Sequence, residues 1–89
     1  MTFSILARDE KTGMLGGAAA TGSLCVGGWV LRGGADRGLS ASQGTAPSTL
    51  WGEDVLTLMQ GGVAAATAVA RVTGHDTGAA HRQLAALDP

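Results

Sequence analysis

Thr2, the second residue of the chain, is the side chain whose position best suits it to act as a nucleophile. A threonine hydroxyl needs a general base, and at a mature N-terminus the residue's own α-amino group, with a pKa of about 7.7–8.0, can take its proton. Processing must first remove Met1, as commonly happens before a residue this small, and a rigid strand must hold the threonine. Two interpretations of Thr2 are therefore open: it is a catalytic nucleophile, or it is the inert first residue of a strand.

Other residues with reactive or ligating side chains lack the spacing that their chemistry requires. No recognisable base accompanies Ser23 or Cys25, and we expect Cys25, the single cysteine, to be a buried inert thiol. Two histidines and one acid occur near each other without the spacing of a zinc site, so we expect solvated loop residues and no bound metal: His75, Asp76 and His81. The glycines form neither a P-loop nor a dinucleotide fingerprint, so no cofactor is expected.

Charge and hydropathy exclude several classes of function. The formal net charge is −1 and the basic residues are scattered singly, so a nucleic-acid partner is not expected. No apolar run reaches the roughly 18 residues that a membrane span needs, and no secretory signal opens the chain, so the expected compartment is the cytoplasm. Arg32 and Arg37 either bind a carboxylate in a pocket or are exposed loop charges. Trp29 and Trp51 are expected to pack in a core or an interface.

The first half of the chain reads as strands. Thr2–Arg8 alternates between two faces, and a charged turn over Asp9–Gly13 leads into a second strand built of small residues. Small residues suit a strand that a ligand or another backbone approaches closely. We expect this second strand to cover Met14–Thr21. The remaining expected segments are an apolar strand over Leu24–Leu31, a glycine-rich connection over Arg32–Arg37 and a fourth strand over Gly38–Gln43.

The period changes after Pro47. Apolar residues at helical spacing predict helices over residues 49–60 and 63–73, each ended by glycine, and a terminal strand or turn over 82–88. Strands over 2–43 followed by helices indicate an α+β fold. A core of small side chains, and an element just beginning as the chain ends, suggest one partial domain over residues 1–89, completed from outside.

Five segments together resemble one family: "TFSILARDEKTGMLGGAAATG", "CVGGWV", "LSASQG", "STLWGEDVLTLMQGG" and "HRQLAALD". The family is a bacterial domain of unknown function in the N-terminal-nucleophile hydrolase superfamily. The similarity covers essentially the whole chain and follows the family's segment order. Members are about twice as long, so this chain resembles the N-terminal half.

This resemblance implies a four-layer αββα sandwich, in which two antiparallel sheets lie between helix layers. It also implies hydrolysis of a small amide, lactam or imide, with Thr2 as the nucleophile and backbone N–H groups holding the oxyanion. Gln43, Arg82 and Gln83 match recurrent family positions, which either are structural or line the site, and they are our candidates for substrate binding. The implied partner is a second polypeptide that completes the sandwich, and an oligomer is expected.

Met1 leaves alternatives open, because it blocks the amine mechanism while it remains. In one, the chain is the N-terminal product of a self-cleaving precursor cut after Pro89, and the nucleophile begins the partner chain. A proline before the scissile bond is unusual. In another, the same fold serves as a non-catalytic module for ligand binding or assembly. In a third, the chain is a truncated fragment with no function of its own.

Overall fold

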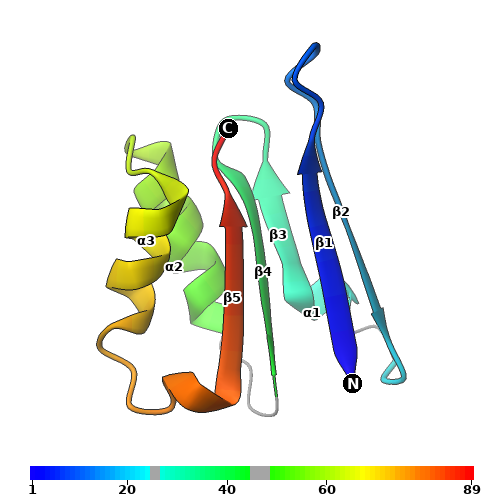
Figure 1. Ribbon diagram of the computed structural model, residues 1–89, viewed down its shortest axis with the longest axis vertical. Coiled ribbons are helices and arrows are strands. Elements are labelled where there is room, and N and C mark those ends of the chain that lie inside the picture. Colours follow the sequence, from blue (N-terminus) through cyan, green and yellow to red (C-terminus); the bar gives the residue numbers. More distant parts are fainter. Residues whose placement is uncertain (25–26, 45–48) are drawn as a thin grey trace.

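Within residues 1–24, 27–44 and 49–89, which the computed structural model describes, the chain forms two antiparallel sheets and two long helices (Figure 1). One sheet is the β1–β2 hairpin, and the other has the strand order β3-β4-β5. The chain is therefore an α+β protein with antiparallel sheets. The elements are β1 (Thr2–Arg8), β2 (Leu15–Thr21), α1 (Gly27–Val30), β3 (Leu31–Gly34), β4 (Gly38–Gly44), α2 (Thr49–Gln60), α3 (Ala65–Thr73), the short 3₁₀ helix η1 (Ala79–His81) and β5 (Arg82–Leu87).

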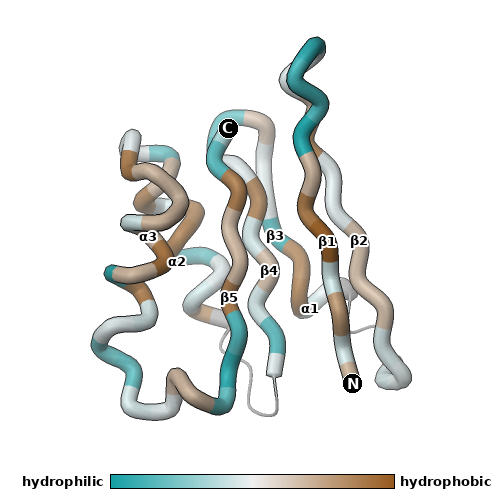
Figure 2. Tube along the Cα trace, in the orientation of Figure 1, coloured by the Kyte–Doolittle hydropathy of each residue, from teal (hydrophilic) through white to brown (hydrophobic). Residues whose placement is uncertain are grey.

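The turn between β1 and β2 fixes the register of the hairpin. The backbone N–H of Asp9 donates to the Met14 carbonyl at 2.9 Å, and that of Gly13 donates to the Asp9 carbonyl at 2.8 Å. Gly13 has a φ of +75°, a conformation that glycine adopts without strain. This closure places Thr2 opposite Thr21 at the other end of the hairpin. Figure 2 shows the turn as a hydrophilic tip beyond the body of the molecule.

Three layers follow one another across the molecule: α2 with α3, then the β3-β4-β5 sheet, then the β1–β2 hairpin (Figure 1). Strand alternation turns Thr2, Ser4 and Leu6 toward the central sheet, where each is partly buried. Phe3 and Ile5 lie on the opposite face of β1 and are 66% and 65% exposed. The outer face of the hairpin is therefore apolar and uncovered within the described chain.

The buried core lies between the helices and the central sheet. Val55, Leu56 and Met59 of α2 pack with Ala68 of α3, and all four are nearly inaccessible to solvent. Leu84 and Ala86 of β5 contact this cluster from the sheet, together with partly buried residues of the two helices. Burial of apolar surface contributes about 25 cal/mol per Å², so this cluster stabilises the contact between the helices and the central sheet.

The segment before β4 differs from the prediction. The structure has the helix Gly27–Val30 where an apolar strand was predicted over Leu24–Leu31, and a strand over Leu31–Gly34 where a connection was predicted. Cys25, which we predicted to be a buried inert thiol, lies outside the described residues. Glycine in β3 serves close packing rather than a loop, because a Cβ on Gly33 would lie 2.8 Å from the Gly38 carbonyl oxygen.

The later elements include two helices and a final strand. The segments predicted as helices over 49–60 and 63–73 contain α2 (Thr49–Gln60) and α3 (Ala65–Thr73). The segment over 82–88, predicted as a strand or a turn, contains β5, which pairs antiparallel with β4. In the described part of the chain, we find no helix with the length and apolar character that a membrane crossing requires.

Asp88, just after β5, connects all three layers. Its Oδ2 accepts a hydrogen bond from the Ala65 backbone N–H at 2.8 Å, at the start of α3, where the N-cap residue Ala64 supplies no side-chain cap. Its carbonyl oxygen accepts a hydrogen bond from Nη1 of Arg8, at the end of β1, at 3.0 Å. One residue thus joins a helix, the central sheet and the hairpin.

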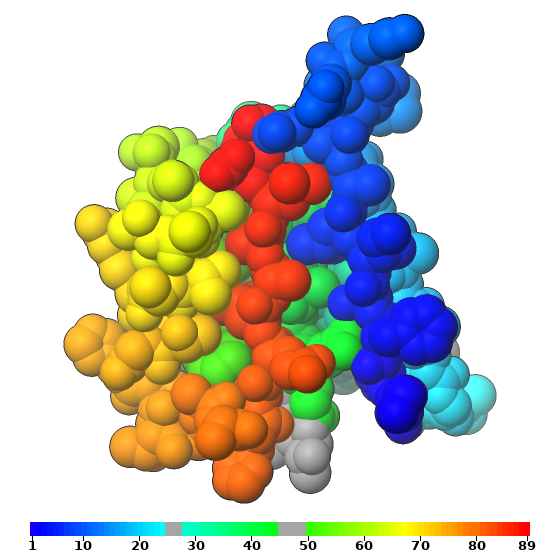
Figure 3. Space-filling view, viewed as in Figure 1, coloured from blue at the N-terminus to red at the C-terminus, as the bar shows by residue number. Residues whose placement is uncertain are grey.

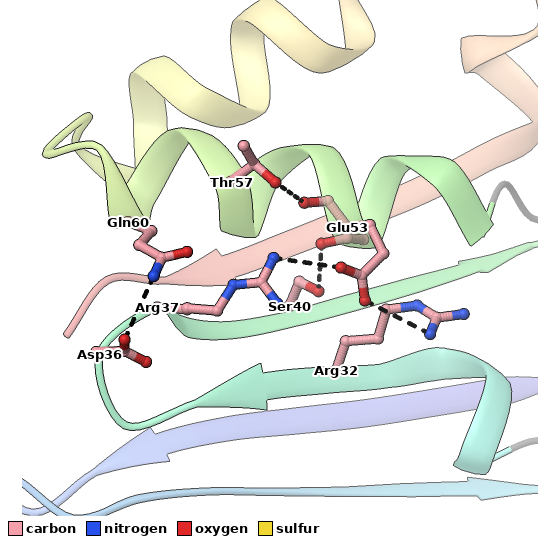
Figure 4. Close-up of polar contacts among 8 residues, drawn as sticks. Arg32, Asp36, Arg37, Ser40, Glu53, Thr57 and Gln60 are labelled. Atoms are coloured by element: carbon pink, nitrogen blue, oxygen red, sulfur yellow. Dashed lines mark hydrogen bonds and ion pairs between the residues drawn. The ribbon is translucent and has the colours of Figure 1, made fainter.

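Ion pairs hold α2 over the β3–β4 turn (Figure 4). Arg37 donates from Nη2 to Glu53 Oε2 at 3.2 Å, and Nη1 of Arg32 lies 3.8 Å from Glu53 Oε1. Ser40, buried beneath them, donates to the Gly52 carbonyl at 3.1 Å. The carboxylate that Arg32 and Arg37 bind is therefore one of the protein's own, and the contact attaches helix to sheet.

Candidate functional site

Thr2 is held at the head of β1 by its partner in the hairpin register. Its hydroxyl donates a hydrogen bond to Thr21 Oγ1 at 3.0 Å, and the same Thr21 oxygen accepts the Ser23 backbone N–H at 3.2 Å. Paired positions of an antiparallel ladder carry their side chains on the same face, which brings the two hydroxyls together. Met1 precedes them as a fully exposed residue.

A cleft of about 510 Å³ opens beside Thr2, between the hairpin and the end of the central sheet. Figure 3 shows β1 on one side and β5 on the other, with atoms of β4 between them. Hydroxyl, amide and imidazole groups predominate among the side chains that line the cleft. The lining residues are Met1, Thr2, Thr21, Ser23, Gln43, Gly44, Ala80, His81, Arg82 and Gln83.

The structure brings three of the predicted site residues together: Thr2, Gln43 and Gln83. Gln43 Nε2 donates to the Thr2 carbonyl oxygen at 2.8 Å and to Gln83 Oε1 at 3.0 Å. Gln43 and Gln83 are paired residues of β4 and β5, so both side chains project from the sheet face that meets the hairpin. The contact between Gln43 and Thr2 crosses from one sheet to the other.

Arg82, the fourth predicted site residue, lines the cleft but directs its guanidinium elsewhere. Nη1 hydrogen-bonds to Asp76 Oδ2, and Cζ lies 5.8 Å from the centroid of the Trp51 ring. The Gly78 backbone N–H, at 2.7 Å from Asp76 Oδ1, is the main cause that holds the pKa of Asp76 below its usual range, and Arg82 adds to it. This cluster fixes the loop that leads into β5.

The two histidines are not gathered into a ligand set. His81 lines the cleft, whereas His75 lies beside the α2–α3 groove with Asp54 and Arg71. Among the residues that the structure describes, no group of three or more His, Cys, Asp and Glu side chains is arranged to hold a metal ion.

Thr21 and Ser4 are site residues that sequence reasoning did not select. Thr21 shares a hydrogen bond with Thr2, and Ser4 Oγ donates to Gln43 Oε1 at 2.9 Å. A usable signal was present for Thr21, because a tight turn over residues 9–13 sets the strand register and so places it opposite Thr2. Nothing in the sequence pattern links Ser4 to Gln43, since they lie on different sheets and 39 positions apart.

The fold and site define a layered α+β protein of antiparallel sheets with a hydroxyl- and amide-lined cleft at the head of its first strand. The chain belongs to DUF1028, a family of unknown function, whose model matches residues 2–89. It is similar to the solved structure of protein SPO2555 from Silicibacter pomeroyi, with 64% identity and a TM-score of 0.93. The match covers 98% of this chain and 38% of that one, so the chain spans well under half the length of this relative. No curated protein matches.

Proposed function

We propose that the protein is an N-terminal-nucleophile amidohydrolase that acts on a small amide, lactam or imide, with Thr2 as the nucleophile. The observation that carries the proposal is the position of Thr2. It heads a strand, its hydroxyl is oriented by Thr21, and it lies in the wall of a cleft lined by hydrogen-bonding groups. The resemblance to the N-terminal-nucleophile superfamily supports the same assignment.

The chemistry requires the free amine of Thr2. Once Met1 is removed, the α-amine takes the proton of the hydroxyl, and Oγ1 attacks the substrate carbonyl carbon. The tetrahedral intermediate collapses when the protonated amine gives its proton to the leaving nitrogen, and the C–N bond breaks to leave an ester on Thr2. Water, deprotonated by the same amine, then attacks the ester, and the carboxylic acid product leaves with the hydroxyl restored.

The proposal includes a larger fold, an αββα sandwich of which this chain supplies three layers. The uncovered outer face of the hairpin, with Phe3 and Ile5 exposed, supports it, because exposed apolar residues gathered on one face mark a surface that another element covers. The chain also spans only 38% of its solved relative. We therefore assign the fourth layer, a helix layer, to the remaining polypeptide, whether continuous with this chain or a separate partner.

An acylation experiment tests the nucleophile. The full-length protein is purified, its intact mass is measured, and it is treated with a β-lactone, whose ring opens on a nucleophilic hydroxyl so that the ester retains the whole mass of the lactone. We expect a mass without Met1 and a single adduct on Thr2. Thr2→Ala should abolish the adduct, Thr2→Ser should retain it, and Thr12→Ala, in the exposed hairpin turn, should leave it unchanged.

Two outcomes contradict the proposal. An adduct that persists in Thr2→Ala places the nucleophile elsewhere, including at the start of a partner chain. A protein that keeps Met1 and forms no adduct favours the second candidate, a non-catalytic module for ligand binding or assembly. The hydrogen bond between Thr2 and Thr21 is compatible with that candidate as well, since cross-strand threonine pairs also stabilise sheets, by about 0.2–1 kcal/mol.

A further inference from the structure

Gln43 is the residue through which the two sheets are hydrogen-bonded next to Thr2. It projects from β4 toward the hairpin, where Oε1 accepts the Ser4 hydroxyl at 2.9 Å and Nε2 donates to the Thr2 carbonyl oxygen at 2.8 Å. Ser4 and Thr2 are neighbours on the inner face of β1. The side-chain amide of Gln43 therefore hydrogen-bonds to β1 at two residues, Thr2 and Ser4.

Hydrogen-bond chemistry fixes which way round this amide lies. The carbonyl oxygen of Thr2 only accepts, and Gln83 Oε1 also accepts at 3.0 Å, so the group that faces both must be the NH₂ of Gln43. Both of its protons are then used within the protein. The side chain of Gln43 has no N–H left to offer a ligand, although it lines the cleft.

Thr2 is consequently fixed from two directions. Gln43 holds its main chain from the central sheet, while Thr21 holds its hydroxyl from the neighbouring strand. A nucleophile gains its advantage from correct placement, and a displacement of about 1 Å can cost on the order of 100-fold in rate. The hydrogen bond that positions the main chain of Thr2 is therefore expected to affect the rate of the reaction directly.

We propose that Gln43 is a positioning residue for the Thr2 nucleophile, and that it acts through the Thr2 main chain rather than by binding substrate. This inference rests on the proposed function. It changes the role expected for Gln43 from substrate binding to placement, and it leaves Gln83, which lines the cleft, as the candidate for substrate contact.

Gln43→Glu in the full-length protein tests the role. The variant keeps the size of the side chain but presents a carboxylate to two acceptors, the Thr2 carbonyl and Gln83 Oε1. The readout is the kinetics of acylation by the β-lactone, resolved into the maximal rate constant and the half-saturating concentration. We expect the rate constant to fall 10- to 100-fold, with the half-saturating concentration within about twofold of wild type.

Three further variants make the result specific. Gln43→Met removes the hydrogen bonds without adding charge and replaces Gln43→Glu if that variant does not fold; it should lower the rate constant in the same way. Gln60→Glu makes the same amide-to-carboxylate change at the exposed last residue of α2, whose amide contacts Asp36 outside the cleft, and should react like wild type. Gln83→Glu adds charge to the cleft but keeps an acceptor for Gln43, so its rate constant should fall less than that of Gln43→Glu.

The outcomes separate this inference from the function on which it rests. If wild type forms no adduct that depends on Thr2, the proposed function fails and the inference falls with it. If wild type reacts but folded Gln43 variants keep its rate constant, only the inference is overturned. A raised half-saturating concentration at an unchanged rate constant also overturns it, because Gln43 would then bind the ligand.

Discussion

The two faces of the central sheet are built from different materials. Toward the helices, the sheet meets Val55, Leu56 and Met59 in a closed apolar core. Toward the hairpin, it presents the amides of Gln43 and Gln83 to the first residues of β1. The facing side of the hairpin carries hydroxyl groups and glycine. The first face contributes mainly to stability, whereas the second also places oriented polar groups beside a cleft.

The largest effect should follow from a cavity on the helix side. Leu56 is almost fully buried, so Leu56→Ala should lower the free energy of unfolding by about 2–5 kcal/mol, through lost burial and an unfilled cavity. Urea denaturation of the full-length protein measures this. Leu50→Ala, on the exposed face of the same helix, is the matched control and should change stability by no more than about 0.5 kcal/mol. Equal losses in both variants would mean that burial does not distinguish these positions.

A smaller effect should follow from overfilling the space between the sheets. A Cβ on Gly17 would lie 3.1 Å from Leu6 Cδ2 and 3.2 Å from the Ile5 carbonyl oxygen, so Gly17→Ala should cost about 1–3 kcal/mol. Gly16, its neighbour on the outer face, has nothing within 4 Å of the same added atom. If Gly16→Ala is as costly as Gly17→Ala in the full-length protein, the proposed fourth layer packs on the outer face as closely as the central sheet packs on the inner face.

The smallest effect concerns pH and the loop before β5. The Gly78 N–H and Arg82 hold the pKa of Asp76 below its ordinary value, so the ionised form is stabilised in the folded state. That stabilisation is present above the unfolded-state pKa and is lost as the pH falls through the lower, folded-state value. Thermal unfolding of wild type should therefore shift to lower temperature as the pH drops below about 4, and Asp76→Asn should show a shallower shift. If the unfolding temperatures of wild type and Asp76→Asn fall equally with pH, Asp76 does not contribute to the loss of stability in acid.

Sequence patterns predict the parts of the fold that depend on interactions between residues close together in the chain. The turn over Asp9–Gly13, the hairpin that it closes and the apolar periodicity near Leu56 all depend on residues close together in the chain. The segment over Leu24–Leu31 did not follow its apolar composition, because β3 is chosen by its packing against β4, where Gly33 permits a close approach. Tertiary contact overrides propensity at such positions.

The candidate site divides in the same way. The sequence predicts Thr2 as a nucleophile because it heads a strand directly after Met1, and the hairpin turn contains the information that pairs it with Thr21. The bonds of Gln43 to Thr2 and Ser4 depend on how two separate sheets stack, which no local pattern encodes. Whether Thr2 is a nucleophile stays a prediction for the acylation experiment.

Asp88 determines which parts of the molecule can open independently. Its carboxylate accepts the Ala65 N–H in the first turn of α3 and its carbonyl accepts from Arg8, so we expect fraying at the end of β5 to break both hydrogen bonds in the same event. The amide proton of Ala65 should therefore exchange with solvent in step with the backbone around Asp88. The opposite end of the hairpin, where Gln43 grips β1, does not depend on that event, which allows the Thr2 cleft to keep its shape while the far end opens.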